Sequence, residues 1–419
     1  MNLDTQCIQR VDCRVCRSNN LERVIELTPT PPGNNFLYEK DLGQQEELFP
    51  LELNFCKNCY HLQLRHIVDP KFLFQNNYSY VSSTSDVFVK HLKEYSDYIS
   101  DFLNLNNKSF VVDIGSNDGT CLKGFKEKGM RVLGIDPASQ IAEAANLNGI
   151  ETIANFFSYR VAQNILKSSG KADLITSHNA CAHIDDLDEI IKGVSLLLKE
   201  NGVFIMEVGY FLDVFTNRWF DTIYHEHLDF HTVMPLEKLF SRFNLEVFRV
   251  ERVSPQGGSI RVFVQKMKGP KDIDETVINL IELEVANGLN DINTLKSFEY
   301  EINNIRTQFK KLLGNLQKQG SKIAAFGAPT KATTLCYHFD IDSEQIDFIV
   351  DDNPLKQGLF SPGKHIPVYN SLAIYEQNPD YVVILAWNFA ASIMEKHKKY
   401  LDSGGGFIVP MPIPEVIKK

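Results

Sequence analysis

A glycine-rich turn between two apolar runs constrains the fold of this chain more than any other feature of its sequence. The apolar run that includes Val111 opens into D-I-G-S-N-D-G-T, and a second run, R-V-L-G-I-D-P, ends at Asp136 and Pro137. Asp136 lies 21 residues after Gly115. This order predicts a buried strand, a tight turn, a helix and a second strand that ends in a carboxylate. We therefore expect an open sheet of parallel strands covered by helices.

The same turn indicates which cofactor the sheet binds. Gly115 and Gly119 leave no Cβ where a ligand's sugar must come close, and Asp136 can accept hydrogen bonds from both hydroxyls of a ribose. Because the turn lacks the G-x-G-x-x-G of dinucleotide sites, S-adenosylmethionine is favoured over NAD. The residues expected to bind it are Asp113, Gly115, Ser116, Asn117, Gly119, Asp136, Pro137 and Asn179.

The strand and helix pattern divides the chain into successive parts. Strands are predicted at 110–114, 131–135, 173–176 and 203–208, and an antiparallel pair within 245–266. A second strand, glycine turn and helix begins at K-I-A-A-F-G-A-P-T-K. We predict a Rossmann-like methyltransferase domain and a second Rossmann-like α/β domain, with boundaries of 1–70 for an N-terminal module, 71–270 for the central domain, 271–318 for a helical linker and 319–419 for the last domain.

Paired cysteines predict a metal site in the N-terminal module. Two C-x-x-C pairs are separated by 39 residues, and the thiolates expected to bind zinc are Cys13, Cys16, Cys56 and Cys59. His61 or His66 could replace one thiolate, and chance pairing or a redox C-x-x-C are the alternatives. Four thiolates close the coordination shell of zinc, so this zinc is expected to be structural.

The composition limits the classes of partner. The 43 basic and 53 acidic residues give a net charge of −10, which argues against unspecific binding to nucleic acid or anionic membranes. The start of the chain lacks a signal-peptide pattern, and no apolar run reaches the length of a membrane span. We therefore expect a cytoplasmic protein that acts on a small molecule, as a monomer or small homo-oligomer.

The densest polar cluster is Y-H-E-H, which runs from Tyr224 to His227 after the strand at 203–208. Ligands of an open α/β sheet bind beyond the carboxyl ends of its strands, so this loop is expected beside the cofactor. A metal is less favoured than a general base, since neighbouring side chains rarely converge on one ion. His183 and Asn179 follow an earlier strand and should face the same place.

In the last domain, G-A-P-T-K combines a glycine turn at a helix start with Lys331. Free backbone N–H groups and a lysine suit a phosphate or pyrophosphate, although the Walker spacing is absent. The later D-D-N-P-L-K-Q-G lies where a ribose-binding acid is expected. Two glycine turns on two α/β units therefore indicate two nucleotide-like ligands.

The chain resembles a known family, the sugar C-methyltransferases that act on keto-sugar nucleotides in deoxysugar pathways. The matching features are the paired C-x-x-C, D-I-G-S-N-D-G, the H-I-D-D at His183, Y-H-E-H, G-G-S-I-R, G-A-P-T-K, K-Q-G and W-N, in this order. They extend over essentially the whole chain. One departure is Thr333, where relatives often carry an asparagine.

The resemblance implies a function and a set of site residues. A methyl group from S-adenosylmethionine would be added to carbon, C3 of a 4-keto-deoxysugar nucleotide, through an enolate. His227 would be the base, Tyr224 and His183 would hydrogen-bond to the enolate oxygen, and Glu226 and Tyr78 would complete the active site. The residues expected to bind the sugar nucleotide are Gly327, Lys331, Thr333, Asp352, Lys356 and Arg261.

Other classes of protein remain open from the sequence. An NAD-dependent sugar-nucleotide dehydrogenase could use the same two sheets, although neither glycine turn matches its motif. An O- or N-methyltransferase would keep the cofactor and need no enolising base. A zinc-finger regulator predicts a basic face, which the net charge disfavours.

Overall fold

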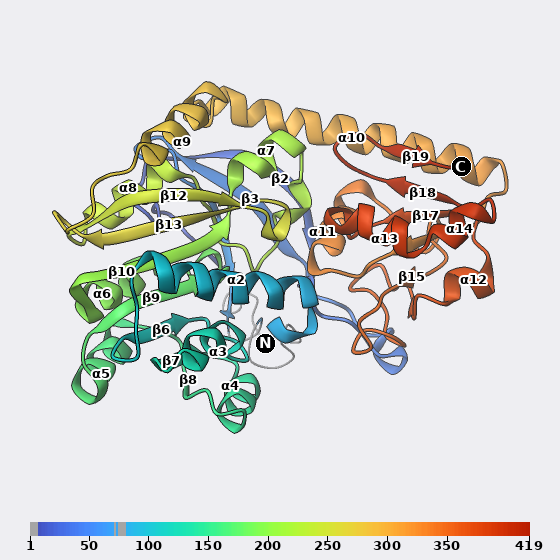
Figure 1. Ribbon diagram of the computed structural model, residues 1–419. Helices are drawn as coiled ribbons and strands as arrows, with labels where there is room; N and C mark the ends of the chain where they lie inside the picture. The colour runs from blue at the N-terminus through green and yellow to red at the C-terminus, as the bar shows by residue number, and fades with distance from the viewer. Residues whose placement is uncertain (1–6, 71–72, 74–80) are drawn as a thin grey trace.

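The computed structural model describes residues 7–70, 73 and 81–419. Its central part is a seven-stranded sheet with the order β12-β13-β10-β9-β6-β7-β8 (Figure 1). The strands are β6 (Phe110–Ile114), β7 (Arg131–Asp136), β8 (Thr152–Ala154), β9 (Ala172–His178), β10 (Leu198–Gly209), β12 (Leu245–Val253) and β13 (Ser259–Lys266). The predicted strands are therefore present, and the pair β12–β13 is antiparallel as expected.

Five strands of this sheet are parallel, and their order reverses between β6 and β9. Such a reversal leaves a crevice at the carboxyl ends of the strands, where ligands of α/β sheets bind. β6 is buried on both faces, which explains its continuous apolar sequence. The helical segments of this part are η3 (Ser82–Thr84), α2 (Asp86–Phe102), α3 (Thr120–Glu127), α4 (Ser139–Leu147), α5 (Tyr159–Ser169), η4 (Cys181–His183), α6 (Leu187–Leu197), α7 (Phe211–Asn217), η5 (Phe220–Thr222), α8 (Val233–Ser241) and η6 (Pro255–Gly257).

The N-terminal region forms a second sheet with the order β11-β4-β3-β2. Three of these strands precede residue 70, but β11 (Asp229–Phe230) follows the Y-H-E-H loop and pairs with β4. The module thus shares a sheet with the segment after His227, which the sequence did not indicate. Its other elements are β1 (Cys7–Gln9), β2 (Leu21–Thr30), η2 (Glu39–Asp41), β3 (Phe49–Cys56), β4 (Leu62–Leu64) and β5 (His66–Val68).

Two helices lead to the last domain. α9 (Glu275–Ala286) ends before Gly288, and the long α10 (Ile292–Lys318) then runs along one edge of the molecule (Figure 1). The last domain has a six-stranded sheet of order β16-β15-β14-β17-β18-β19. Its elements are β14 (Ile323–Phe326), α11 (Thr330–Phe339), β15 (Ile349–Val350), β16 (Val368–Tyr369), α12 (Ala373–Gln377), β17 (Tyr381–Ile384), η7 (Trp387–Phe389), α13 (Ala390–Lys396), α14 (Lys398–Asp402), β18 (Gly406–Val409) and β19 (Glu415–Ile417).

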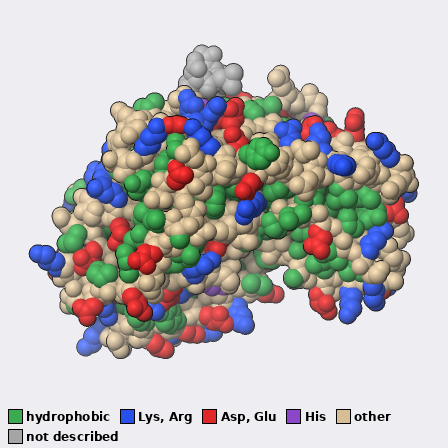
Figure 2. All heavy atoms as spheres, turned by 90° about the horizontal axis from the view of Figure 1, so that it is seen from above, with side chains coloured by type: hydrophobic (Ala, Val, Ile, Leu, Met, Phe, Trp, Pro, Cys, Tyr) green, Lys and Arg blue, Asp and Glu red, His purple; other side chains and the backbone are tan. Residues whose placement is uncertain are grey.

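These features confirm the predicted fold class, an α/β protein with two sheets of Rossmann-like character and an N-terminal cysteine module. On the face shown in Figure 2, basic and acidic side chains are interspersed rather than gathered by sign. Within the described residues, no helix is both long enough and apolar enough to span a membrane.

Candidate active site and zinc site

The four cysteines of the N-terminal module form one cluster. Their sulfur atoms lie within 4.8 Å of one another, with Cys13 Sγ 3.5 Å from Cys59 Sγ and Cys16 Sγ 3.6 Å from Cys56 Sγ. This spacing and donor chemistry fit a tetrahedral thiolate site for zinc. The histidine alternative is wrong for His61, whose Nε2 is 2.7 Å from Asp229 Oδ1 in a fully buried pair.

The predicted cofactor turn follows β6, and the structure shows a reason for its glycines within the protein itself. Gly115 and Gly119 have φ angles of 73° and 80°. A Cβ on Gly115 would lie 2.4 Å from the Cβ of Ala180, and one on Gly119 would lie 2.8 Å from Ile150. The left-handed backbone and the close packing against the protein itself therefore require glycine at both positions.

Asp136 holds the turn together. Its Oδ2 accepts a hydrogen bond from Asn117 N and its Oδ1 from Ala138 N, both at 2.9 Å. Asn117 in turn accepts at Oδ1 from the backbone N–H of Ser82, just before α2. Burial raises the pKa of Asp136. The carboxylate lies at the end of β7 as predicted, and it organises the backbone around the crevice.

Several polar atoms around this turn are buried without a protein partner among the described residues. They are Asp113 Oδ1, Ser116 Oγ, Asn179 Nδ2 and both ring nitrogens of His178. Burial, with a smaller effect of Asp136, raises the pKa of Asp113 well above its usual range. Buried polar groups usually have partners, so these atoms indicate a polar ligand with both donors and acceptors. An amino acid and a ribose, as in S-adenosylmethionine, meet that requirement.

Two members of the Y-H-E-H run form a pair. His227 Nδ1 donates to the carbonyl oxygen of Thr222 at 2.9 Å, so the neutral ring presents Nε2 as an acceptor. Tyr224 donates its hydroxyl proton to this Nε2 at 2.8 Å. Burial, followed by the neighbouring His183, lowers the pKa of His227 to about 3. The ring is therefore neutral at physiological pH and can accept a proton.

His183 lies beside this pair, with a distance of 5.0 Å between its ring centroid and that of His227. Its Nδ1 donates to the carbonyl oxygen of Glu226 at 2.6 Å. Burial lowers its pKa to about 4, so it too is neutral. The structure thus brings Tyr224, His183 and His227 together, whereas Tyr78 lies outside the described residues.

The other two members of the run face the N-terminal module. His225 is buried with Nε2 directed at the carbonyl oxygen of Phe49. Glu226 Oε1 accepts from Asn34 Nδ2 at 2.9 Å, and the tautomer of His227 is set by the carbonyl oxygen of Thr222. Burial raises the pKa of Glu226 to about 7.

This pKa predicts a measurable dependence of stability on pH. The folded state holds the Glu226 proton up to a higher pH than the unfolded state, so this contribution to stability is present below about 4.5 and lost as the pH rises through about 7. The stability of Glu226→Gln relative to the unsubstituted protein should therefore rise by about 2.5 kcal/mol between pH 5 and 8. Urea unfolding of both proteins at the two pH values measures the difference. An equal difference at both would contradict the prediction.

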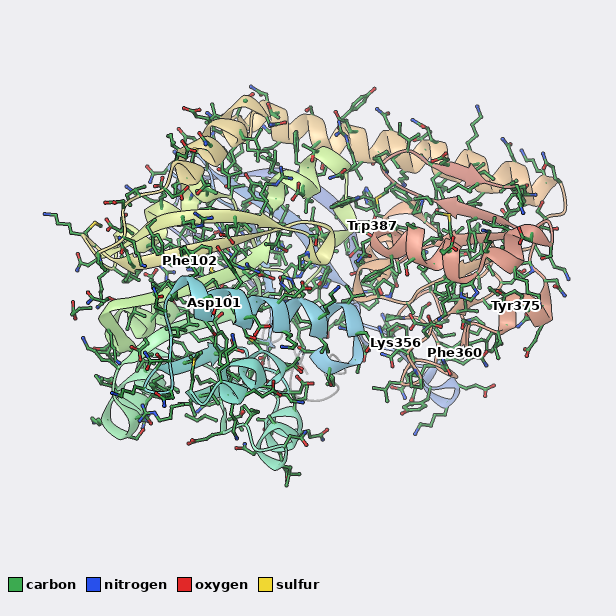
Figure 3. All side chains as sticks on the ribbon, viewed as in Figure 1. Asp101, Phe102, Lys356, Phe360, Tyr375 and Trp387 are labelled. Carbon is green, nitrogen blue, oxygen red and sulfur yellow. The ribbon has the colours of Figure 1, made fainter. Side chains whose placement is uncertain are left out.

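The last domain places Lys331 close to Asp221 and Lys356 close to Glu226. Figure 3 labels Lys356. Lys331 Nζ donates to Asn388 Oδ1 at 2.8 Å and lies 3.2 Å from the ring centroid of Trp387. Burial lowers its pKa to about 8. Lys356 Nζ donates to the carbonyl oxygen of Ala328 at 2.7 Å. Two half-buried cations beside one glycine turn suit an anionic ligand.

The remaining predicted substrate residues have other surroundings. Gly327 has a φ of 91°, and a Cβ there would lie 2.5 Å from Ala386 Cβ, so it shapes the turn. Thr333 donates to the carbonyl oxygen of Gly33 in the N-terminal module. Asp352 pairs with Lys396 at 2.6 Å, whereas its neighbour Asp351 accepts from Ala328 N in the glycine turn. Asp351 is therefore the better candidate for the acid after this strand.

Arg261 lies in the central sheet and not in the last domain. Its Nη2 is 2.9 Å from Glu207 Oε2, and the same carboxylate is 2.6 Å from His91 Nε2. Together with Tyr95 and Tyr98, His91 and Arg261 line an open cavity of about 320 Å³. Sequence reasoning missed His91 and Glu207, because only the fold brings α2 over the end of β10.

Asp221, Trp219 and Trp387 connect the two large domains. Trp387 Nε1 donates to Asp221 Oδ2 at 2.7 Å, and the rings of Trp219 and Trp387 stack with centroids 4.5 Å apart. Lys331 lies over the same Trp387 ring. The glycine turn of the last domain thus faces the segment that leads into Y-H-E-H. The W-N pair of the sequence was the only signal for this contact.

Comparison with known proteins decides the family. Models of a zinc binding domain, a methyltransferase domain and a C-methyltransferase C-terminal domain match residues 13–74, 88–250 and 254–412. The C-methyltransferase NovU of Streptomyces niveus is 35% identical over 406 residues, which cover 97% of this chain and 96% of NovU. The chain belongs to the C-methyltransferase family. The predicted resemblance to C-methyltransferases, the cofactor S-adenosylmethionine and the zinc-binding module are thereby confirmed.

More distant matches of this C-methyltransferase are confined to part of the chain. A ubiquinone biosynthesis O-methyltransferase of Pelagibacter ubique is 30% identical over 121 residues, which are 27% of this chain and 49% of the relative. A solved S-adenosylmethionine-dependent methyltransferase of Clostridium acetobutylicum is 18% identical with a TM-score of 0.35, covering 43% of this chain and 93% of the other. The family assignment rests on the models and NovU, and it decides against a dehydrogenase or a zinc-finger regulator.

Proposed function

We propose that this C-methyltransferase adds a methyl group to the carbon beside the ketone of a nucleotide-linked keto-sugar, C3 of a 4-keto-deoxysugar. The pair formed by His227 and Tyr224 carries the proposal, because a neutral imidazole with an accepting Nε2 is the base that enolisation needs. A methyltransferase acting on oxygen or nitrogen has no such need. Branched deoxysugar synthesis is the pathway class that this reaction serves.

The chain's own residues account for the proton transfer. His227 Nε2 takes the proton from the carbon next to the ketone, the C–H electron pair forms the new C=C bond, and the carbonyl π pair moves onto oxygen to give the enolate. The Thr222 carbonyl stabilises the imidazolium through Nδ1–H. The Tyr224 hydroxyl, released from Nε2, then donates to the enolate oxygen. S-adenosylmethionine, when bound, supplies an electrophilic methyl on its sulfonium sulfur.

His183 receives a different role from the one first expected. Since its neutral ring already donates through Nδ1 to the Glu226 carbonyl, it has no second proton for the enolate oxygen. Instead it fixes the backbone of the Y-H-E-H loop and packs against the ring of His227. We therefore assign the donor role to Tyr224 alone, and a positioning role to His183.

The nucleotide is proposed to bind at the last domain. Lys331 and Lys356 flank the turn from Gly327 to Thr330, where backbone N–H groups at the start of α11 favour a phosphate. Both lysines are half-buried, and a pyrophosphate would add negative charge beside them to that of the nearby carboxylates. The Lys331 side of this turn contacts Trp387 and faces Asp221, which supports an orientation with the sugar end toward His227.

Isotope exchange tests the proposal. The protein is incubated in D₂O with a panel of 4-keto-deoxysugar nucleotides and S-adenosylhomocysteine, and deuterium at C3 is followed by NMR. We expect hydrogen exchange at C3 that requires His227. We expect methylation at C3 when S-adenosylmethionine replaces S-adenosylhomocysteine. Methylation on oxygen or nitrogen, or methylation without any exchange competence, would overturn it.

A further inference from the structure

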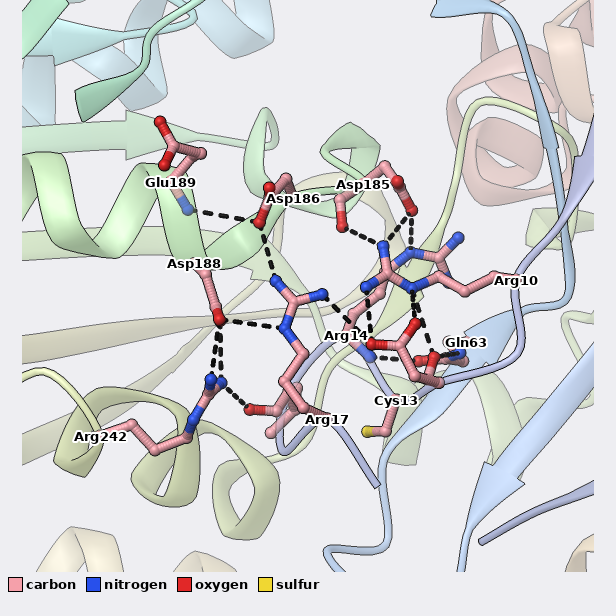
Figure 4. A network of polar contacts seen from close by, with 12 residues as sticks. Arg10, Cys13, Arg14, Arg17, Gln63, Asp185, Asp186, Asp188, Glu189 and Arg242 are labelled. Carbon is pink, nitrogen blue, oxygen red and sulfur yellow. Dashed lines mark hydrogen bonds and ion pairs between the residues drawn. The ribbon is translucent and has the colours of Figure 1, made fainter. Parts of the chain in front are cut away.

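The two zinc knuckles are the turns that carry Cys13 and Cys16 (the first) and Cys56 and Cys59 (the second). A network of ion pairs joins the first zinc knuckle to the segment that follows His183 (Figure 4). Arg10 and Arg14 both donate to Asp185 Oδ1, at 2.7 and 2.9 Å. Arg17 and Arg242 pair with Asp188 at 3.0 and 2.7 Å. Exposed ion pairs contribute little to stability, so most of this network holds the N-terminal module against the segment after His183 without adding much to the free energy of unfolding.

Arg14 differs from the other arginines because its side chain is fully buried. It lies between the zinc ligands Cys13 and Cys16. Its Nη1 donates to the carbonyl oxygens of Leu64 at 2.8 Å and of Leu228 at 3.3 Å. One guanidinium therefore contacts Asp185, two residues after His183, and the residue immediately after His227.

The second zinc knuckle reaches the same loop by another route. His61 follows the ligand Cys59 by two residues, and its carbonyl oxygen accepts from Cys56 N. Its ring pairs with Asp229, two residues after His227, and both side chains are fully buried. Leu228 N also donates to the carbonyl oxygen of Ala182 at 2.7 Å. Both knuckles thus hold the segment from His227 to Asp229 against the turn that carries His183.

We propose that Arg14, supported by His61, is a positioning residue that transmits the geometry of the zinc knuckles to His183 and His227. The inference rests on the proposed role of His227 as the base. Zinc fixes the backbone on both sides of Arg14, and the planar guanidinium passes that position to two separate backbone segments. A misplacement of about 1 Å at a reacting group costs about 100-fold in rate.

Stability alone does not explain a buried arginine here. Burial of a guanidinium carries a desolvation cost that an apolar side chain of similar volume avoids, and Arg14 Nη2 has no partner among the described residues. A methionine at this place could fill the same volume. A methionine side chain has no donors, so it could not hold Asp185 and Leu228 at a defined separation as the Arg14 guanidinium does.

The test compares Arg14→Met with Arg242→Met in the full-length zinc protein. Arg242 belongs to the same network and donates to the carbonyl oxygen of Val15 in the first knuckle, but it contacts neither Asp185 nor Leu228. We expect Arg14→Met to keep one zinc per chain and the affinity for S-adenosylmethionine, while kcat falls about 10- to 100-fold at an unchanged KM. Amide hydrogen exchange across 224–230 should accelerate in Arg14→Met only. The control should match the unsubstituted protein in every respect.

Further measurements separate the possible outcomes. Nitrogen-15 NMR of the histidine rings should show His183 and His227 losing their uniform Nδ1–H tautomer in Arg14→Met, and this readout needs no substrate. If Arg14→Met does not fold, Arg14→Lys must show the same loss of kcat, because lysine keeps the charge but lacks the planar guanidinium that bonds to two segments. Unchanged kcat, exchange and tautomers overturn the inference. Absence of substrate C–H exchange in the unsubstituted protein would instead overturn the proposed function.

Discussion

Replacement of His227 by alanine is expected to lower kcat by about 1000-fold, because a positioned general base contributes about 10²- to 10⁴-fold. The affinity for S-adenosylmethionine should be unchanged, since His227 bonds to Thr222 and Tyr224 and not to the residues of the cofactor turn. Transfer of a labelled methyl group gives the rate, and calorimetry gives the affinity. The pKa of about 3 further predicts that His227 itself causes no loss of activity between pH 5 and 8.

Tyr224→Phe is the matched variant for this experiment. It keeps the aromatic ring that packs against His227, with centroids 4.1 Å apart, and removes only the hydroxyl. A smaller loss of about 10- to 100-fold is expected, because one donor to the enolate is lost while the base remains. A rate of His227→Ala within a factor of three of the unsubstituted protein would rule out His227 as the base.

Loss of the zinc ligand Cys56 is expected to have the largest effect on stability. Cys56→Ser should release the metal and lower the thermal midpoint by about 10 °C or more, since metal binding and folding of such modules are coupled. The damage should extend beyond the module, because β11 of the central chain segment pairs with β4. Metal analysis and calorimetry after dialysis measure both effects.

Cys7→Ser is the matched control for the metal experiment. Cys7 belongs to the same region but lies outside the cluster of four sulfur atoms. This variant should retain one zinc per chain and an unchanged midpoint. Full zinc content in Cys56→Ser would show that another residue completes the site, which would contradict the assignment of four thiolates.

The elements that could be predicted from the sequence are those set by local patterns. β6 matches the predicted 110–114 exactly in extent, since a strand buried on both faces appears as a continuous apolar run. The antiparallel pair β12–β13 was likewise visible on either side of Pro255. In the last domain, by contrast, the segment I-D-F-I-V-D-D-N at 346–353 forms only the short strand β15, because only Ile349 and Val350 pair with neighbouring strands.

The candidate site was predicted only in part, because neighbours in sequence separate in space. Of the four consecutive residues of Y-H-E-H, Tyr224 and His227 meet, whereas His225 and the Glu226 side chain face the N-terminal module. The residue that hydrogen-bonds to Glu226, Asn34, lies nearly 200 positions earlier in the chain. No local pattern could identify such a partner.

By itself, the amino-acid sequence determined which chemical groups are available: a glycine turn after a buried strand, four thiolates at metal-binding spacing, and a run of titratable residues. Apolar periodicity and backbone geometry act over a few residues, so these features can be predicted from the sequence without a structure. Only the tertiary structure decided which nitrogen of His227 is available, that Asp351 rather than Asp352 reaches the second turn, and that Arg14 joins a zinc knuckle to the segment after the Y-H-E-H loop. Those assignments depend on hydrogen bonds between segments far apart in the chain, which form only when the sheets and domains pack.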